Sequence, residues 1–373
     1  MKLLFVVRGL FPDQIGGSAR HSYFLIKHLA KMDVEIDVIH PNENEHFNNR
    51  DNIKEINIPY GKSILNYSSR VSDWIDNRLY DIGYSDGLSL IKYVKKRKFP
   101  CFFNHHGFHM FQKQYFFRYF LEDFVSAVKD LGLWWPRRQA CKYMANHSDY
   151  VISLGEGLTN VLHNNLKIPL GKIIEIPNGV EKNIISTKGS GSLNGITFLF
   201  VGSLKFRKGL TYLINAIEKL SAEANFIIVG DGPLKSKMDS IENSGLKVLG
   251  RISDEELFNL YPKVDCFIFP SLQEGMPTVI LEAMANSLPI IASDVGATST
   301  LVSNENGFLI SPGNTKEILD AVQTFVNLPH YKRADLGEKS RKIVVENFVW
   351  SVIAEEYYNE FDKVIKSPIP PNV

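Results

Sequence analysis

The sequence predicts an α/β protein built from two doubly wound, Rossmann-like domains that face each other across a cleft. Three observations support this fold class. The chain has 373 residues, more than a single hydrophobic core usually holds. Apolar strand patterns alternate with helical patterns in both halves, which is typical of parallel sheets with helical crossovers. A small, polar and glycine-rich stretch at 187–195 has the composition of a linker between them.

The N-terminal domain, expected over 1–182, begins with a continuous apolar run at 3–7. Such a run is typical of a parallel strand that is covered on both faces. A glycine-rich turn follows, and a helical pattern then extends over about 19–31. Further strands are predicted at 34–39, 101–103, 150–153 and 173–176.

The alternation restarts after the linker, in a second domain expected over 195–349. Strands are predicted at 196–201, 226–229, 248–249, 264–269 and 289–292. Helices are expected to begin near Leu210, Leu234 and Asp254, and another is expected over 278–285. Helices also close the chain. The last, over about 350–364, carries aromatic and apolar side chains at helical spacing, so we expect it to pack against a core.

The composition excludes several classes of protein. A net charge of +1 gives no general argument for nucleic-acid binding. Three distant cysteines without CxxC spacing argue against a disulfide framework or a zinc site, and they favour a reducing compartment. The first apolar run is too short for a signal peptide, and no stretch approaches the roughly 20 apolar residues that span a bilayer. We therefore expect a cytoplasmic protein whose membrane contact is at most peripheral, at the inner membrane face.

Residues 85–145 combine basic and aromatic side chains. In this stretch Lys and Arg outnumber Asp and Glu, and residues such as Phe103, Phe116 and Trp135 are interleaved with them. A surface of this kind suits an anionic membrane or an anionic acceptor. A solvated helix face above core aromatics explains the same pattern, so both interpretations stay open.

The turn before the helix predicted at 278–285 has the properties of a phosphate site. Gly275 lets the backbone approach a ligand closely, and Pro277 stands where helices commonly begin. The helix then starts at about Thr278, where free amide groups and the helix dipole favour a phosphate.

Two carboxylates flank this turn. Glu282 lies one turn into the helix and can accept two hydrogen bonds from a vicinal diol such as a ribose. Glu274 precedes the turn and can reach a second polyol, such as a sugar. Taken alone, two carboxylates near a helix start are also common on protein surfaces.

The sequence EGMPTVILEAMA at 274–285, followed by LPIIASDVG at 288–296, resembles the signature of the large retaining glycosyltransferase family 4, which has the GT-B fold. Other segments follow in the order of that family, densely over 196–312 and sparsely over 40–145. They are Gly16-Gly17, His106-Gly107, IPNGV at 176–180, GSLKFRKG at 202–209, VGDGP at 229–233 and LGRISDEEL at 249–257.

The resemblance implies roles for single residues. Glu282 would bind the donor ribose, while Glu274 would hold the sugar and, with the backbone around Gly275, the pyrophosphate. Lys208 would pair with the diphosphate and stabilise the leaving group. The implied catalytic set is Glu274, His106 and Lys208. The implied donor-binding set is Gly16, Gly17, Ser203, Arg207, Lys208, Arg251, Ile252, Glu274, Gly275, Met276, Pro277, Thr278 and Glu282.

The chain departs from the family at one of these positions. The family has an arginine directly after the first glycine of GSLKFRKG, where this chain has Ser203. One of the two usual diphosphate cations is therefore missing from its expected place. Lys205 and Arg207 lie in the same loop, and of the two we favour Arg207 as the substitute.

The N-terminal half supplies His106, which precedes Gly107 as the active-site histidine of the family does. The resemblance places it beside the transferring sugar, where it would position or polarise rather than attack. His105 is expected to be structural. Two adjacent histidines also fit a metal site, but no matching ligand cluster follows them in the sequence. Gly16 would border the diphosphate and the acceptor.

The function implied by the resemblance is transfer of a sugar from a nucleotide diphosphate donor, UDP- or GDP-linked, to a glycan or lipid-linked acceptor, with retention at the anomeric carbon. No cofactor other than the donor is expected, and no metal, because the chain has no Asp-x-Asp motif. Two alternatives stay open. One is an epimerase or hydrolase of the same fold, and the other is a non-catalytic subunit that binds sugar nucleotides. The family also implies that residues 350–373 pack back on the N-terminal domain, although a capping helix of the second domain fits the pattern too.

Overall fold

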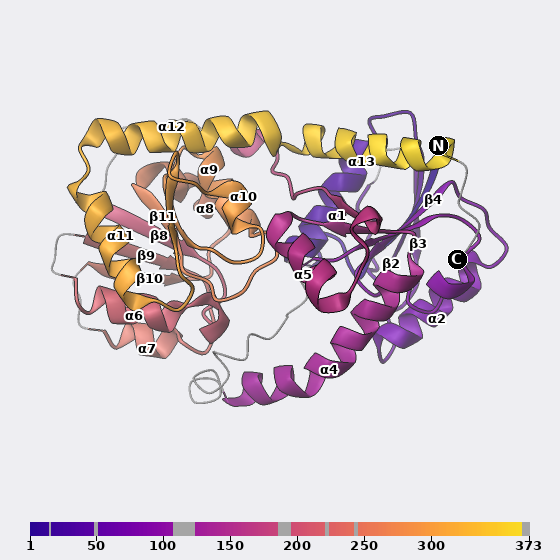
Figure 1. Cartoon of the computed structure of the whole chain (residues 1–373), viewed down its shortest axis with the longest axis horizontal. Coiled ribbons are helices and arrows are strands. Elements are labelled where there is room, and N and C mark those ends of the chain that lie inside the picture. Colours follow the sequence, from indigo (N-terminus) through magenta and orange to yellow (C-terminus); the bar gives the residue numbers. More distant parts are fainter. Residues whose placement is uncertain are drawn as a thin grey trace. The chain divides into compact units, whose positions relative to one another are not determined.

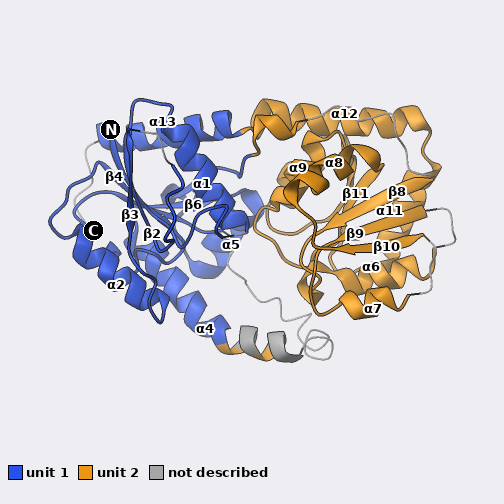
Figure 2. Cartoon of the chain, turned by 180° about the vertical axis from the view of Figure 1, so that it is seen from behind, with its two compact units in different colours: residues 1–108, 133–179, 350–373 blue, residues 109–132, 180–349 orange. Residues whose placement is uncertain are grey.

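The computed structural model describes residues 1–14, 16–47, 51–106, 124–185, 195–220, 224–241, 245–367 (Figure 1). The chain divides into two compact units, coloured separately in Figure 2. Unit 1 contains Met1–Phe108, Leu133–Gly179 and Trp350–Val373, and unit 2 contains His109–Gly132 and Val180–Val349. The predicted linker at 187–195 lies outside the described residues except for Gly195.

Unit 1 is built on a parallel sheet whose described strands follow the order β3-β2-β1-β4-β5-β6-β7. The strands are β1 (Lys2–Val6), β2 (Glu35–His40), β3 (Ile53–Asn57), β4 (Ile82–Asp86), β5 (Cys101–Asn104), β6 (Tyr150–Ser153) and β7 (Ile173–Glu175). Its helices are α1 (Gly17–Leu29), α2 (Ile64–Ile75), α5 (Glu156–Leu166) and α13 (Trp350–Lys366), and α4 (Phe124–His147) enters it from unit 2.

The last helix, α13, completes the core of unit 1 by packing against α1. Tyr357 and Phe361 are fully buried there, with Phe361 4.9 Å from the ring of Phe102 in β5. A side chain at Gly179 would lie 2.9 Å from the indole of Trp350, so the glycine permits the close approach of this helix.

Unit 2 repeats the plan with described strands in the order β10-β9-β8-β11-β12-β13, again parallel. The strands are β8 (Ile196–Val201), β9 (Ala224–Val229), β10 (Leu246–Gly250), β11 (Cys266–Phe269), β12 (Ile290–Ser293) and β13 (Gly307–Ile310). The helices are α6 (Leu210–Ile217), α7 (Lys235–Asp239), α8 (Asp254–Leu260), α9 (Thr278–Ala285), α10 (Thr298–Leu301), α11 (Thr315–Asn327) and α12 (His330–Asn347).

Both sheets reverse their strand order at one point, between β1 and β4 in unit 1 and between β8 and β11 in unit 2. In open α/β sheets, ligands bind outside the carboxyl ends of the strands at such a switch point. The loops that follow β8 and β11 are those singled out in the sequence, 202–209 and 270–277. The fold thus brings the two motif-bearing segments of unit 2 to one edge of its sheet.

The predicted fold class is confirmed by the two parallel, doubly wound sheets. Strands β3, β4 and β13 were not predicted from the sequence, whereas α9 has the predicted bounds. Among the residues that the structure describes, no helix combines the length and the hydrophobicity needed to cross a membrane.

Candidate functional site

The centre of the candidate site in unit 2 is an ion pair between Lys208 and Glu274. Lys208 Nζ lies 2.6 Å from Glu274 Oε1, and the two side chains are only 14% and 10% exposed. The Ser271 hydroxyl also donates to Glu274 Oε1, at 2.6 Å. The ammonium lies 4.9 Å from the ring centroid of Phe269, within the range of a cation–π contact. A cation and an anion are therefore held together at the carboxyl edge of the sheet.

Each partner changes the protonation equilibrium of the other. Burial raises the pKa of Glu274, but Lys208 and Arg207 together outweigh burial and hold the pKa of the carboxyl below its ordinary value. Burial lowers the pKa of Lys208, Arg207 lowers it further, and Glu274 opposes both without cancelling them. The carboxylate is therefore ionised at neutral pH, and both of its oxygens can accept hydrogen bonds.

The loops after β8 and β11 are joined by backbone contacts. The carbonyl of Arg207 accepts from the amide of Leu272 at 2.9 Å, and the Arg207 guanidinium donates to the carbonyl of Gln273 at 3.3 Å. Gly209 has a φ of +69°, and a Cβ there would lie 1.8 Å from the carbonyl oxygen of Pro270. Only glycine satisfies both conditions, so the KG pair that ends GSLKFRKG positions Lys208 against the second loop.

The turn after Glu274 is supported from behind by the segment that follows β12. Gly296 has a φ of +59°, and a Cβ there would lie 2.3 Å from the carbonyl oxygen of Glu274 and 2.4 Å from that of Gly275. The amide of Ala297 donates to the carbonyl of Gly275 at 2.8 Å. Gly296, which ends the second signature segment, and the following Ala297 therefore hold the backbone of the turn.

Helix α9 carries the second predicted carboxylate. Thr278 is its first residue and Pro277 its N-cap, as the sequence predicted. Glu282 is 8% exposed, and its Oε2 accepts from the hydroxyl of Tyr261 at 3.1 Å. Met276 is buried beneath the turn. Glu282 is thus buried and hydrogen-bonded to Tyr261, unlike a solvated surface carboxylate.

The other predicted donor residues of unit 2 lie in loops at the same edge. Ser203 follows β8 and is half-buried, and Lys205 beside it is exposed. Arg207, in contrast, is half-buried and lies next to the Lys208–Glu274 pair. Arg251 is exposed and Ile252 half-buried between β10 and α8, whose N-terminus has a capping box of Ser253 and Glu256.

Unit 1 contributes a separate cluster around His106. His106 Nε2 lies 2.7 Å from Asp86 Oδ1, and Asp86 is 1% exposed at the end of β4. Burial raises the pKa of Asp86, but His106, with smaller contributions from Arg8 and His21, outweighs burial and the net pKa is lowered. The ring of His21, in α1, lies 5.0 Å from that of His106. Gly107, which completes the predicted pair, lies outside the described residues.

His21 and His105 are buried and neutral. His21 Nδ1 donates to Asn178 Oδ1 at 2.8 Å, and its Nε2 lies 3.1 Å from the hydroxyl of Tyr84. Burial lowers the pKa of His21 to about 3. Burial likewise lowers the pKa of His105 to about 4. His105 is 1% exposed, which agrees with the structural role expected for it.

Gly16 and Gly17 begin α1, directly after the segment that follows β1. Gly16 is the N-cap with a φ of +152°, a value that favours glycine, and Gly17 is the first helical residue. A Cβ built at either position meets no atom of the described residues within 4 Å. Both glycines are exposed.

Three residues of these clusters were missed in the sequence. Ser271 and Tyr261 hold the two predicted carboxylates, and Asp86 pairs with His106. Asp86 ends a strand that lacks a continuous apolar run, so the strand and its terminal carboxylate were overlooked together. The sequence signal that could have identified Asp86 is a carboxylate directly before a glycine, as in Asp86-Gly87.

Two family models match the chain. Residues 15–183 match Glycosyltransferase Family 4, and residues 195–327 match Glycosyl transferases group 1. The chain belongs to the group 1 and family 4 glycosyltransferases. This membership confirms the resemblance found in the sequence.

Curated relatives match over part of their length. The chain is 32% identical over 214 residues to an uncharacterised glycosyltransferase of Methanocaldococcus jannaschii, covering 56% of this chain and 58% of the relative. It is 25% identical over 223 residues to the capsular polysaccharide biosynthesis glycosyltransferase CapM of Staphylococcus aureus, covering 51% and 58%. It is 33% identical over 178 residues to the UDP-Gal:alpha-D-GlcNAc-diphosphoundecaprenol alpha-1,3-galactosyltransferase of Escherichia coli, covering 42% and 44%. The chain thus spans about half the length of these relatives.

Solved structures share the fold over nearly the whole chain. Sucrose-phosphate synthase from Thermosynechococcus elongatus superimposes with a TM-score of 0.76 at 18% identity, over 97% of this chain and 98% of that one. The Anabaena protein HepE in complex with UDP-glucose superimposes with a TM-score of 0.73 at 17% identity, over 97% and 100%. These likenesses confirm the GT-B fold.

Proposed function

We propose that this protein transfers a sugar from a nucleotide diphosphate donor to a glycan or lipid-linked acceptor, with retention at the anomeric carbon. The observation that carries the proposal is the buried Lys208–Glu274 pair at the switch point of unit 2, with Ser271 beside it. It brings a cation for the diphosphate and an acceptor for sugar hydroxyl groups to one place.

In this proposal the donor is bound by unit 2 residues. Glu282 accepts hydrogen bonds from the ribose, and the loop with Arg251 and Ile252 contacts the base. The free amides at the start of α9 and the Lys208 ammonium take the diphosphate charge. Arg207 replaces the arginine missing at Ser203, because it already lies beside Glu274. Binding is proposed to need no metal, since cationic side chains and a helix N-terminus supply the charge.

The proposed chemistry uses no covalent intermediate with the protein. The acceptor oxygen bonds to the anomeric carbon on the face that the nucleotide leaves, as the bond to the phosphate oxygen breaks. A donor phosphate oxygen takes the acceptor proton. The protein supplies position and charge: Lys208 stabilises the developing diphosphate charge, and His106, oriented by Asp86, lies beside the sugar.

UDP is the nucleotide we favour over GDP. The Escherichia coli relative is named for a UDP-galactose donor and a diphosphoundecaprenol acceptor, and HepE of Anabaena is described with UDP-glucose. CapM is named for capsular polysaccharide biosynthesis. A UDP-hexose and a lipid-linked glycan of a surface polysaccharide are therefore the first donor and acceptor to test.

The test combines donor binding and turnover. UDP-, GDP- and ADP-sugars are screened by thermal shift, and specific stabilisation by one class identifies the base. Transfer is then measured for the wild type, for Glu274→Gln and for Glu255→Gln, a control at an exposed carboxylate in α8. We expect Glu274→Gln to lower kcat by on the order of 10²-fold or more, because hydrogen bonds to the sugar in the transition state are lost. Circular dichroism checks that the variant is folded.

Three outcomes contradict the proposal. Wild-type activity in Glu274→Gln would show that the central residue of the proposal is not needed for transfer. Release of free nucleotide or epimerised donor without an acceptor supports a hydrolase or epimerase. Donor binding without turnover across many acceptors supports a non-catalytic binding subunit.

We also propose peripheral membrane contact through α4. Val128 and Trp135, two turns apart on this helix, are 47% and 62% exposed, and the Arg137-Arg138 pair follows them. Exposed tryptophan beside arginine is typical of a helix at an anionic interface. The described part of the 85–145 stretch thus carries apolar and basic groups together.

Vesicle co-sedimentation tests this contact. The wild type should bind vesicles that contain anionic phospholipid, and Trp135→Ser should bind several-fold less, because the buried indole area is lost. Leu170→Ser is the matched control, since Leu170 is 55% exposed outside α4. Equal binding by the wild type and Trp135→Ser would place membrane contact elsewhere or exclude it.

A further inference from the structure

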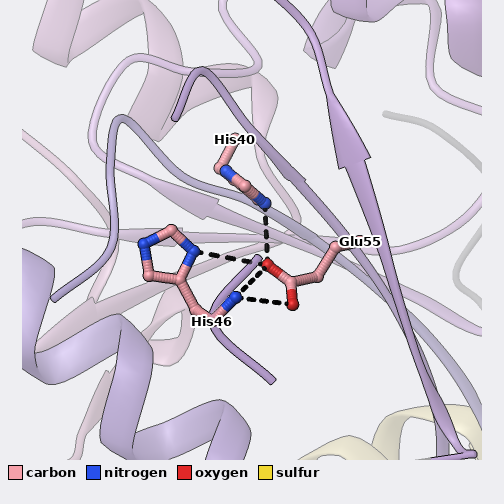
Figure 3. A group of neighbouring side chains, drawn as sticks. All are labelled: His40, His46 and Glu55. Carbon is pink, nitrogen blue, oxygen red and sulfur yellow. Dashed lines mark hydrogen bonds and ion pairs between the residues drawn. The ribbon is translucent and has the colours of Figure 1, made fainter. Parts of the chain in front are cut away.

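A second polar cluster lies in unit 1, in a part of the sequence that the proposed function does not use (Figure 3). His40 ends β2, Glu55 lies in β3, and His46 lies in the connection between these strands. In the parallel pairing of β2 with β3, Val38 stands opposite Glu55, so His40 and Glu55 point to the same face of the sheet. The fold therefore brings together three side chains that are separated in sequence.

The distances within the cluster fit metal ligands. His40 Nε2 lies 3.0 Å from Glu55 Oε2, and His46 Nδ1 lies 3.4 Å from the same oxygen. One nitrogen of each ring and a carboxylate oxygen all lie within 4.8 Å of one another. Tetrahedral zinc with ligands at about 2.0–2.2 Å holds its donor atoms roughly 3.3–3.5 Å apart. Only small side-chain movements separate this arrangement from a bound ion.

The cluster is buried, and its polar atoms are incompletely satisfied. The side chains of His40, His46 and Glu55 are 2%, 1% and 9% exposed. His40 Nε2 pairs with the Glu55 carboxylate, but among the described residues its other ring nitrogen, Nδ1, has no hydrogen-bond partner. Buried polar atoms normally have partners, so the polar atoms of this cluster have capacity for one more. An ion at this point would supply it.

The surroundings orient two of the three groups. Glu55 accepts from the backbone amides of His46 and Phe47, at 2.8 and 2.7 Å, which fix its carboxylate. On the far side of the His46 ring, Nε2 lies 3.3 Å from Asp13 Oδ2, and Asp13 accepts in turn from Asn44 at 2.9 Å. A carboxylate behind the second nitrogen of a metal-ligating histidine is a recurrent arrangement, because it fixes the tautomer and raises ligand basicity.

We propose that His40, His46 and Glu55 bind one divalent transition-metal ion, and that zinc is the ion which this ligand set fits. Two imidazoles and one carboxylate are a known zinc ligand set, and water completes the tetrahedron. The ion joins the end of β2, the following connection and β3, so it stabilises this edge of unit 1. The sequence predicted no metal, because the three ligands converge only when β2 and β3 pair.

The test measures zinc binding by the full chain, independently of any transferase activity. Protein stripped with a chelator is titrated with zinc against a competing chromophoric chelator, and stoichiometry is measured by elemental analysis. We expect one zinc ion per chain in the wild type and a raised Tm on zinc addition, because the ion binds only the folded site. His46→Gln and Glu55→Gln should each lose this ion and the shift.

Asp13→Asn keeps all three ligands and should weaken zinc binding by about 10–100-fold. It therefore tests the site even if a ligand variant fails to fold. His330→Gln, at an exposed histidine of unit 2, and His106→Gln, in the other histidine cluster, should bind zinc like the wild type. No binding by the wild type at micromolar zinc would overturn the proposal and leave a metal-free His–Glu network. Retention of the ion by His46→Gln, or its loss in His106→Gln, would also overturn it.

Discussion

Lys208 and Glu274 are held together out of water before any donor arrives. Each charge is stabilised in this place chiefly by the other, with Arg207 and Ser271 also stabilising Glu274. Removal of one partner leaves a buried charge without its main compensation, whereas removal of both leaves none. The pair therefore makes the two side chains interdependent in stability as well as in the proposed binding of the donor.

A double-mutant cycle tests this interdependence. Lys208→Met should lower the free energy of unfolding by about 3–5 kcal/mol, because Glu274 stays buried without its partner. Lys208→Met combined with Glu274→Gln should destabilise by less than the sum of the single changes, with a coupling of about 0.5–3 kcal/mol. Urea unfolding followed by circular dichroism gives these values. The exposed pair Lys316–Asp320 is the control, and its cycle should show no measurable loss. Additive effects at Lys208 and Glu274 would contradict the prediction.

Lys208, Glu274 and Glu282 could be singled out from the sequence because a motif fixes both their residue type and their local frame. Their roles stay predictions. Partners from other segments were not foreseen. Ser271 has no distinctive sequence context, and Tyr261, in the turn that follows α8, reaches Glu282 of α9 only in the folded chain. Such contacts depend on tertiary structure and leave no local pattern.

At the scale of elements, the turn between β11 and α9 depends on Gly296. Alanine there would have to adopt a positive φ and would also press on the carbonyls of Glu274 and Gly275. We expect Gly296→Ala to lower stability by more than the roughly 1–2 kcal/mol that the left-handed conformation alone costs. It should also weaken donor binding at least several-fold, because the displaced carbonyls belong to the proposed donor turn. Thermal unfolding and donor titration measure the two effects.

Gly61→Ala is the matched control for this prediction. Gly61 has a similar φ, +72°, but the nearest atom of the described residues to a Cβ there would be 3.4 Å away. This variant should show the conformational cost and unchanged donor affinity. Equal losses in the two variants would mean that the contact with the donor turn is unimportant.

The elements that were predicted and those that were missed differ in burial pattern. Strands β1, β8 and β11 are continuous apolar runs because helices or loops cover both faces. Strand β3 is only half-buried at the edge of its sheet and reads Ile-Lys-Glu-Ile-Asn. Strand β4 is fully buried but contains Gly83, Ser85 and Asp86, so it lacks the apolar run from which a buried strand is predicted. A buried strand with polar residues is recognised only once its neighbours are known.

For the molecule as a whole, buried titratable groups predict a loss of stability in acid. Burial lowers the pKa of His21 to about 3 and that of His105 to about 4, so both are neutral when folded and titrate near 6.5 when unfolded. The unfolded chain then binds more protons between these values, and stability falls as pH falls from 6.5 toward 4. The lowered pKa values of Asp86 and Glu274 act in the same direction at lower pH.

The slope of stability against pH tests this account. All four tryptophans of the chain lie in the ranges of unit 1, so their fluorescence reports the unfolding of the unit that contains His21. His21→Asn should reduce the slope between pH 6.5 and 4 by up to about 1.4 kcal/mol per pH unit, since one proton less is taken up on unfolding. His330→Asn, at an exposed position, should leave the slope unchanged. An unchanged slope in His21→Asn would show that this ring is protonated in the folded state.

The return of α13 to unit 1 has a consequence for synthesis of the chain on the ribosome. The described strands of unit 2 lie between Val180 and Val349, so they are all synthesised before α13. Unit 1 begins first but needs Trp350, Tyr357 and Phe361 to complete its core, and these are translated only after unit 2. The core of unit 1 therefore stays incomplete while unit 2 is synthesised, and chaperones would have to protect the apolar face of α1 during that time.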